Sequence, residues 1–438
     1  MNISFSDVQD PKQTPYVELC LVEVNRLNRL SVDKSVAGNK NDTVKMHVAE
    51  DGNTFVLTTG KTGVKLGPNA EKHQTYPITA WEELLQKYEN MRYVIVSTQE
   101  VGKKTVTMTG DYKEIANKSV RDIITKLLKE AAEAIRQSIS ISFDDITDER
   151  LQEGQKIVLF LTENKEKLTV KEFNDYLMEL WRVIPRAMTQ INRKLVRDPS
   201  QYENKIIEEQ ELLDKLYQNL RGNDVIRPDM DILEANGIEM RPCTDEELEE
   251  IKELMTTERG NLVRAWAVRN KVSEEAYEAY KKQRGFKDGE GETLLFHGSG
   301  VENWWSIMKN SLKLNPELTK PGVRICGKAF GYGIYFAPYA AKSMSYARST
   351  RTYTSDGSVR YMGVYRVMTG NPYFIYQDPN RKTPHNWSDF HADHPDMDCC
   401  WASSGYDGSD VGLMRLNYDE TIVYREDQCT IKYLLEFI

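Results

Sequence analysis

The sequence predicts an α+β protein of several domains: a small β-rich domain, then an all-helical domain, then a mixed α+β domain. Its first hundred residues hold β-branched runs separated by turn signals. Residues 119–222 repeat apolar side chains at helical spacing, and Thr293–Ala347 combines two apolar runs with a helical pattern and three glycines in seven residues. At about 150 residues per domain, 438 residues allow two to four domains. We place them at residues 1–112, 113–225 and 226–438.

The first domain is predicted to be a sheet with one helix. Val17–Val24 is β-branched and partly alternates apolar and polar residues, as a strand does. Thr43–Val48 and Thr54–Thr58 flank Asp51-Gly52, which is a hairpin-turn signal. Ala80–Tyr88 then follows the pattern of an amphipathic helix.

The second domain is predicted to be a set of amphipathic helices. Thr169–Glu172 and Ser200–Glu203 have the capping-box pattern that begins a helix. Apolar stripes at helical spacing follow these starts and also precede them, and we expect them to form the core. The stripe members named by the pattern are Val120, Ile123, Ile124, Leu127, Leu128, Ala131, Ile135, Phe173, Tyr176, Leu177, Leu180 and Trp181.

Composition restricts the class of protein. A hydrophobic content of 40% with 29% charged residues is typical of a soluble globular chain, and no apolar run approaches the roughly 20 residues of a membrane span. Six cysteines without a Cys-x-x-Cys pair argue against a disulfide framework and zinc fingers. The N-terminus lacks a signal-peptide pattern, so we expect an intracellular protein, nuclear in a eukaryote or cytoplasmic in a bacterium. A net charge of −9 requires any nucleic-acid contact to come from a local patch.

The third domain begins with helical patterns at Thr244–Leu248 and Glu258–Lys282 and a turn at Gly285–Gly289. Three short motifs then follow in order. An apolar run ends in His297-Gly298-Ser299, a second run reads Gly333-Ile-Tyr-Phe-Ala337, and a third reads Glu420-Thr-Ile-Val-Tyr424. Taken singly, each motif residue has an ordinary structural explanation, since isolated matches are weak hypotheses. Together and in this order, they resemble the catalytic domain of the poly(ADP-ribose) polymerase family, an α+β fold with a split sheet.

The resemblance implies an NAD-consuming ADP-ribosyltransferase, a glycosyltransferase that releases nicotinamide and needs no metal. It implies a catalytic set of His297, Tyr335 and Glu420, in which Glu420 polarises the acceptor hydroxyl. It implies that the ring of Tyr346 stacks on the nicotinamide and that Gly298, having no side chain, lets a ligand amide approach the backbone. Family positions in contact with NAD correspond to Gly298, Ser299, Asn303, Lys313, Gly333, Ser343 and Tyr346, and those on the acceptor side to Lys342 and Tyr418. Lys313 and Lys328 stand where the family has an Arg and a Tyr.

The remaining domains have family counterparts as well. The first resembles the WGR domain, which senses DNA ends, with Thr59-Gly60-Lys61 in place of Trp-Gly-Arg. Gly60 and Lys61 are therefore the expected DNA contacts, and they are weak ones because lysine lacks the bidentate fork of arginine. The second resembles the regulatory helical domain that restricts access of NAD. The expected partners are NAD, DNA breaks and protein acceptors including the chain itself, in a DNA-damage response.

Two alternatives to a self-modifying, DNA-stimulated polymerase remain open from the sequence. One is a mono-ADP-ribosyltransferase, although the presence of Glu420 favours polymerisation. The other is a DNA-end-binding scaffold with a vestigial catalytic domain. A separate question concerns His385–Cys400, which is rich in His, Asp and Cys. Because its two cysteines are adjacent, which suits a tetrahedral zinc site poorly, we expect an acidic surface loop there instead.

Overall fold

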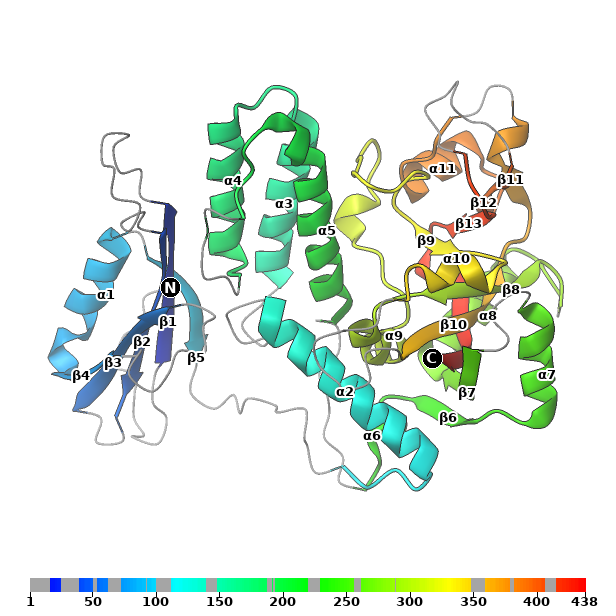
Figure 1. Ribbon diagram of the computed structural model, residues 1–438, viewed down its shortest axis with the longest axis horizontal. Helices are drawn as coiled ribbons and strands as arrows, with labels where there is room; N and C mark the ends of the chain where they lie inside the picture. Colours follow the sequence, from blue (N-terminus) through cyan, green and yellow to red (C-terminus); the bar gives the residue numbers. More distant parts are fainter. Residues whose placement is uncertain are drawn as a thin grey trace. The chain divides into compact units, whose positions relative to one another are not determined.

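The computed structural model describes residues 16–24, 39–49, 53–61, 72–91, 93–99, 112–138, 148–186, 191, 194–219, 229–255, 261–287, 289–347, 359–378, 382–405 and 415–438 (Figure 1). The chain divides into two compact units. The first holds Met1–Thr105 and Ile135–Glu209, and the second holds Val106–Ala134 and Gln210–Ile438. Each unit has its own sheet and core.

The first unit contains a five-stranded antiparallel sheet in the order β4-β3-β2-β1-β5. The predicted strands and the helix after them are confirmed, while the predicted turn at Asp51-Gly52 lies outside the described residues. The elements are β1 (Tyr16–Val24), β2 (Asn39–Val48), β3 (Thr54–Lys61), β4 (Lys72–Pro77), α1 (Trp81–Asn90) and β5 (Val94–Gln99).

Alternation along the strands builds the core of this sheet. Val44, Met46 and Val48 of β2 are buried at every second position, as a strand with one covered face requires. They pack with Phe55 of β3, whose ring meets Trp81 of α1 edge-on at 5.0 Å between centroids. The helix therefore covers the apolar face of the sheet.

Helices complete the first unit: α3 (Asp148–Asn164), α4 (Val170–Val183) and the beginning of α5 (Tyr202–Asn219). The predicted capping box at Thr169 and Glu172 is confirmed, with both reciprocal hydrogen bonds present. The one predicted at Ser200 is wrong. A short 3₁₀ turn opens that segment instead, and the Asp198 side chain caps it by accepting from the Ser200 amide.

In the second unit, a five-stranded antiparallel sheet has the order β6-β7-β14-β10-β8, and a four-stranded sheet has the order β11-β12-β13-β9. This confirms a mixed α+β architecture with more than one sheet. The elements are α2 (Lys118–Ser138), α6 (Ile232–Ala235), β6 (Ile238–Pro242), α7 (Asp245–Leu254), β7 (Leu262–Asn270), α8 (Lys271–Gln283), β8 (Glu292–Gly298), α9 (Trp304–Asn310), β9 (Ile334–Phe336), α10 (Ala340–Met344), β10 (Arg360–Met368), β11 (Pro372–Phe374), α11 (Trp387–Asp393), β12 (Cys399–Ala402), β13 (Glu420–Val423) and β14 (Cys429–Phe437).

One predicted helix in this unit is partly wrong. The expectation of a helix over Glu258–Lys282 holds for α8 only, since Leu262–Asn270 forms strand β7. This strand pairs with β6 on one side and β14 on the other. Ladder bonds on both edges therefore outweigh the helix-favouring charged residues of the segment.

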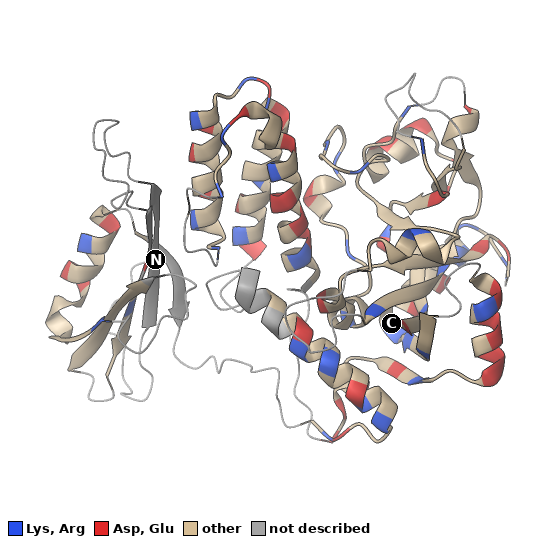
Figure 2. Cartoon of the chain, in the orientation of Figure 1, with Lys and Arg blue, Asp and Glu red and all other residues tan. Residues whose placement is uncertain are grey.

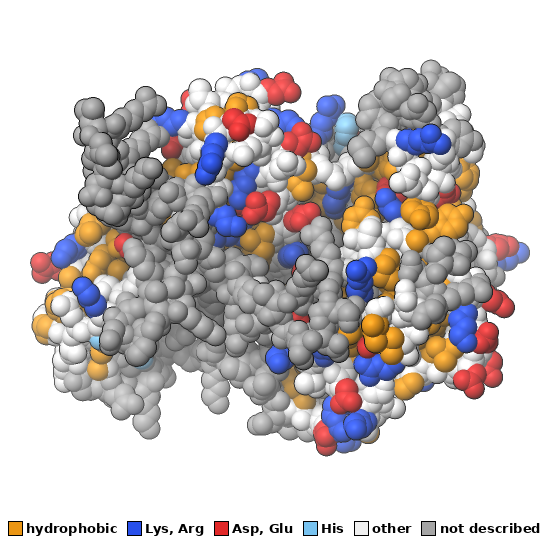
Figure 3. Space-filling view, viewed as in Figure 1, with side chains coloured by type: hydrophobic (Ala, Val, Ile, Leu, Met, Phe, Trp, Pro, Cys, Tyr) orange, Lys and Arg blue, Asp and Glu red, His pale blue; other side chains and the backbone are white. Residues whose placement is uncertain are grey.

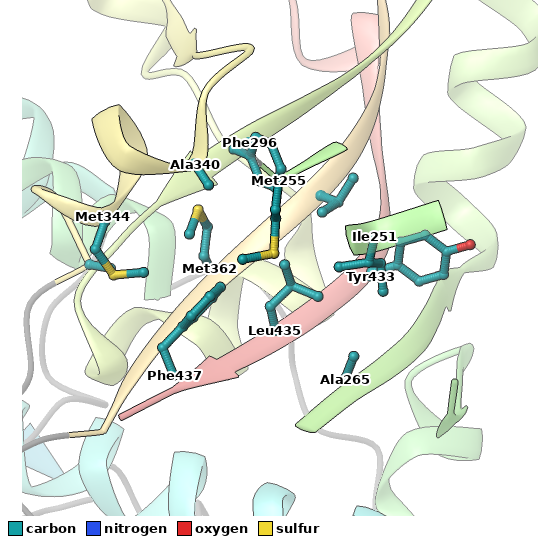
Figure 4. Packing of buried hydrophobic residues seen from close by; sticks show 12 residues of the cluster. Ile251, Met255, Ala265, Phe296, Ala340, Met344, Met362, Tyr433, Leu435 and Phe437 are labelled. Atoms are coloured by element: carbon teal, nitrogen blue, oxygen red, sulfur yellow. The ribbon is translucent and has the colours of Figure 1, made fainter. Parts of the chain in front are cut away.

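Apolar side chains from one face of the larger sheet form a core with α7 and α10 (Figure 4). Phe296 of β8 and Met362 of β10 point into it, together with Ile251 of α7 and Ala340 of α10. Another side of the same sheet meets α2, where the buried Trp266 indole donates to the Ser119 hydroxyl at 3.1 Å. The sheet is thus held from two directions.

A backbone bridge joins the two sheets of this unit. Phe296, two residues before the end of β8, and Ala337, just after β9, exchange both backbone hydrogen bonds, at 2.8 and 3.0 Å. The third site motif follows on the next strand, because β13 pairs with β9 through Thr421–Phe336 and Ile422–Tyr335. The three motifs that are distant in sequence therefore converge here.

Charged residues of both signs are interspersed along the helices of each unit (Figure 2). On the visible face, hydrophobic and Lys or Arg side chains of the second unit lie close together in small groups (Figure 3). Within the described residues, no helix is long and apolar enough to cross a membrane.

Candidate functional site

His297 lies one residue before the end of β8, where the two sheets meet. Its Nδ1 is 2.9 Å from the carbonyl oxygen of Tyr335. Because a carbonyl oxygen only accepts hydrogen bonds, Nδ1 carries the hydrogen and Nε2 keeps a free lone pair. Burial lowers the pKa of His297 to about 4, the charge of Lys328 acts in the same direction, and the bond to Tyr335 opposes both. At neutral pH the ring is therefore uncharged and can accept a hydrogen bond at Nε2.

Tyr335 is the central residue of β9, and its side chain is fixed by the loop before that strand. Its hydroxyl donates to the carbonyl of Gly331 at 2.8 Å and accepts from the amide of Phe330 at 3.0 Å. Burial raises the pKa of this phenol well above its ordinary value, and the negative charge of Glu420 adds to the rise. Tyr335 is therefore neutral, and two hydrogen bonds hold its side chain in the site.

Two glycines permit this arrangement. Gly331 adopts φ of 77°, and a Cβ there would lie 2.3 Å from the carbonyl oxygen of Pro384. A Cβ on Gly333 would lie 2.6 Å from Cγ2 of Ile422, the neighbour of Tyr335 across the ladder. Any side chain at either position would push the loop or β13 away.

Glu420 is the first residue of β13 and is buried, with a relative exposure of 7%. Its Oε1 lies 2.5 Å from Nζ of Lys342 on α10. Burial lowers the pKa of Lys342, but the hydrogen bond and charge of Glu420 outweigh burial and raise it overall. The carboxylate and the ammonium therefore face each other as a partly buried ion pair.

Gly298 has a packing role that the sequence did not indicate. A Cβ on this glycine would lie 1.9 Å from the backbone carbonyl oxygen of Ser343, so the end of α10 touches the strand directly. The Ser343 hydroxyl is used within the protein, donating to the carbonyl of Phe296 at 3.0 Å. Close contact of α10 with β8 thus fixes the position of Lys342, one residue earlier.

The residues after β8 form a polar turn. Asn303 Nδ2 donates to the Ser299 hydroxyl at 3.0 Å, while the buried Oδ1 of Asn303 has no partner among the described residues. Ser299 can still donate its own hydrogen, and Asn303 can still accept. This turn therefore keeps polar capacity beside His297.

The other candidate residues differ in their contacts. Lys313 is already paired, with Nζ 2.8 Å from Oε2 of Glu426. Tyr346 is exposed, and the ammonium of Lys342 lies 5.6 Å from its ring centroid. Tyr418 is exposed beside Tyr339, with 6.0 Å between ring centroids. Gly60 and Lys61 belong to the first unit, at the end of β3 opposite Thr43 and Asp42.

Asp419 is a site residue that the sequence analysis missed. Its Oδ2 accepts from the Trp401 indole at 3.0 Å, and its Oδ1 accepts from the Ser404 amide at 2.7 Å. Burial raises the pKa of Asp419, but these hydrogen bonds outweigh it and hold the pKa below the ordinary value. The residue directly before Glu420 is therefore anchored, and its adjacency to Glu420 was the only available signal.

The segment His385–Cys400 is not the acidic surface loop that we expected. It contains α11 and the beginning of β12, and Asp398, Cys399 and Cys400 are buried. Asp398 Oδ1 accepts from Arg284 Nε at 2.6 Å and its Oδ2 from the Asn371 amide at 2.9 Å. Across the described ranges, no three His, Cys, Asp or Glu side chains are grouped so that they could hold a metal ion.

Comparisons with known proteins find one matching family model and several relatives. Residues 245–438 match the model of the poly(ADP-ribose) polymerase catalytic domain. Poly [ADP-ribose] polymerase 1 of Danio rerio is 27% identical over 168 residues, covering 36% of this chain and 16% of that protein. Poly [ADP-ribose] polymerase 2 of Homo sapiens is 29% identical over 171 residues, covering 34% of this chain and 28% of that protein. An uncharacterized protein of Invertebrate iridescent virus 6 is 22% identical over 188 residues, covering 43% of this chain and 76% of that protein. The chain thus spans less than a third of the length of the two polymerases.

Proposed function

We propose that the chain, whose residues 245–438 match the poly(ADP-ribose) polymerase catalytic domain, transfers ADP-ribose from NAD to an acceptor and releases nicotinamide. One observation carries the proposal. His297, Tyr335 and Glu420 come from three strands that meet, with β8 bridged to β9 and β9 paired with β13.

In this proposal NAD binds along the end of β8. A ribose hydroxyl of NAD donates to the free Nε2 of His297, which is neutral and correctly protonated for that purpose. Ser299 and Asn303 supply further polar groups. The exposed ring of Tyr346 stacks on the nicotinamide, which adds about 0.5–1.5 kcal/mol beyond area burial.

The chemical step exchanges one bond to the ribose carbon for another. The C–N bond to nicotinamide breaks, and its electron pair leaves with the nicotinamide as positive charge develops on the ribose. The acceptor hydroxyl oxygen then bonds to the same carbon and gives up its proton. Glu420 accepts the hydrogen bond of that hydroxyl and takes its proton, while its negative charge stabilises the oxocarbenium-like state. Lys342 holds the carboxylate in place.

We propose repeated rather than single transfer, because a carboxylate is present at Glu420 and fixed by Lys342. Incubation of the purified chain with labelled NAD tests this on a denaturing gel. Repeated transfer produces a smear above the position of the chain, whereas single transfer produces one shifted band. Absence of label on any protein would contradict both.

Stimulation by broken DNA is a second part of the proposal. The WGR-like first domain at residues 1–112 engages a DNA end through Gly60 and Lys61, and the helical domain at residues 113–225 restricts the site until it does so. DNA can raise activity only if it binds the open state more tightly, and a hundredfold activation requires about 2.7 kcal/mol of differential binding. Comparing label incorporation with and without nicked DNA measures this stimulation.

Deleting the whole helical segment is a poor test of this restriction. The first part of α2 packs on the catalytic sheet, where Ser119 meets Trp266 and the ammonium of Lys126 lies 5.6 Å from the Tyr361 ring. Removing α2 would expose Trp266, which is fully buried. Point substitutions on α5 are therefore the better test.

A further inference from the structure

Lys328 lies in the loop between Gly327 and Gly331, directly before the strand that carries Tyr335. Its ammonium is 4.7 Å from the ring centroid of Tyr332 and 5.9 Å from that of Tyr335. Aromatic faces attract a cation without neutralising it. In the part of the chain that the structure describes, no carboxylate oxygen lies within 4.0 Å of this ammonium. Lys328 therefore brings a positive charge that is held in no direct ion pair with a described carboxylate to the wall of the site.

The other lysines around the site differ in this respect. Lys313 is paired with Glu426 at 2.8 Å, and Lys342 with Glu420 at 2.5 Å. Lys320, seven residues before the start of that loop on the same connection, is exposed and paired with Glu317. A lysine already held by a carboxylate must break an ion pair to bind an anion, and Lys328 need not.

The field of Lys328 reaches the site residues. Its charge contributes to the low pKa of His297, where burial is the main cause. Burial also raises the pKa of Asp214 on α5, and the charge of Lys328 opposes that rise. Both groups thus lie within electrostatic reach of the ammonium. An anion that binds beside His297 would meet the same positive field.

We propose that Lys328 binds the pyrophosphate of the dinucleotide and so makes the site select ligands that carry it. This deepens the proposed function and rests on NAD being the substrate. The pyrophosphate is the only anionic part of NAD between the two riboses, and a ribose hydroxyl is already assigned to His297. A compact ammonium suits a pyrophosphate as a point charge.

Calorimetric titration of the full chain with ADP-ribose and, separately, with adenosine tests this assignment. ADP-ribose carries the pyrophosphate and adenosine does not. Lys328→Met should weaken the binding of ADP-ribose about tenfold, equivalent to about 1.4 kcal/mol, and should leave that of adenosine within about twofold. Lys320→Met, which removes an exposed and paired lysine of the same connection, is the matched control and should change neither. Lys328→Arg should keep most of the affinity for ADP-ribose.

Three results would overturn the proposal: an affinity for ADP-ribose within twofold of wild type in Lys328→Met, an equal loss for adenosine, or no binding of ADP-ribose to the wild type. If Lys328→Met does not fold, the salt dependence of binding to the wild type tests the proposal. Raising the salt concentration must weaken the binding of ADP-ribose to the wild type and not that of adenosine. Nicotinamide release from NAD reports on the proposed function independently. Binding that depends on Lys328 without nicotinamide release would refute the function and leave the assignment standing.

Discussion

Glu420→Gln removes one negative charge from the site while preserving the shape of the side chain. In the wild type, Oε1 of Glu420 faces the Lys342 ammonium at 2.5 Å, and the two side chains have exposures of 9% and 22%. Glutamine can keep a neutral hydrogen bond to Lys342 through its amide oxygen. It can neither take the proton of an acceptor hydroxyl nor stabilise positive charge on the ribose.

Two magnitudes follow from this geometry. Loss of one preorganised electrostatic contact in a transition state costs about a hundredfold to a thousandfold in rate, and chain elongation should fall by that amount. In the proposed binding mode the nicotinamide end is held by other residues, among them Ser299 and Tyr346, so binding of a nicotinamide analogue should change by less than about threefold. The ion pair is partly buried, so its loss should destabilise the fold by about 1–3 kcal/mol, between the exposed and buried limits.

The assay is label incorporation from NAD over time, read separately as the first transfer and as polymer length. Glu436→Gln is the matched control, because Glu436 is also nearly buried and pairs with Arg264 at 2.7 Å, away from the site. Both variants lose one charge from an ion pair, so a general loss of stability should affect them alike. Only Glu420→Gln should lose elongation. Polymer of wild-type length and rate from that variant would refute the assigned role, as would an equal loss from Glu436→Gln.

Four further predictions concern the same unit. Ser311 has φ of 62° and ψ of 178° and a buried hydroxyl without a partner among the described residues, so Ser311→Gly should raise the unfolding free energy by about 1–2 kcal/mol in urea titrations; a lower midpoint would disprove the strain. Asp419→Ala removes the anchor before Glu420 and should lower elongation about tenfold while ADP-ribose binding persists; unchanged elongation would show that the anchor is dispensable. If the helical segment restricts the site, Asp214→Asn on α5 should raise the transfer activity measured without DNA, and Glu211→Gln on the same helix should not. Equal activities of the two variants would argue against restriction through Asp214. The pKa of His297 is about 4 in the folded chain and 6.5 ordinarily, so the unfolded chain binds more protons between these two pH values. The free energy of unfolding should therefore fall by about 3 kcal/mol as pH drops from 6.5 to 4, relative to His297→Asn. Parallel curves of unfolding free energy against pH for the two proteins would exclude this.

Local pattern was sufficient where neighbours in sequence determine the structure. The capping box at Thr169 and the strands at Thr43–Val48 and Thr54–Thr58 needed only adjacent residues, and all three are present. The strand Leu262–Asn270 was missed because its partners are β6 and β14, and β14 lies more than 150 residues later in the chain. Pairing of that kind leaves no local signal, and the charged surroundings favoured a helix.

The segment His385–Cys400 was misjudged for a related reason. Acidic residues in a polar stretch usually face solvent. Asp398 is instead buried, and its carboxylate is paired with Arg284, which lies 114 residues earlier. The order of three short motifs did place His297, Tyr335 and Glu420 on strands that meet. What it could not supply is how they are held: Asp419 anchors one of them, and the backbone of Ser343 occupies the space that Gly298 leaves.

Transfer of ADP-ribose from NAD is the central claim, and nicotinamide release coupled to labelling of protein measures it most directly. The purified chain is incubated with NAD labelled in its adenosine half, and free nicotinamide and protein-bound label are counted in the same sample, with and without nicked DNA. The account predicts that nicotinamide appears together with label on the chain, and that Glu420→Gln lowers the label far more than Glu436→Gln does. Absence of nicotinamide above background in both conditions, or nicotinamide release with no label on any protein, would contradict it.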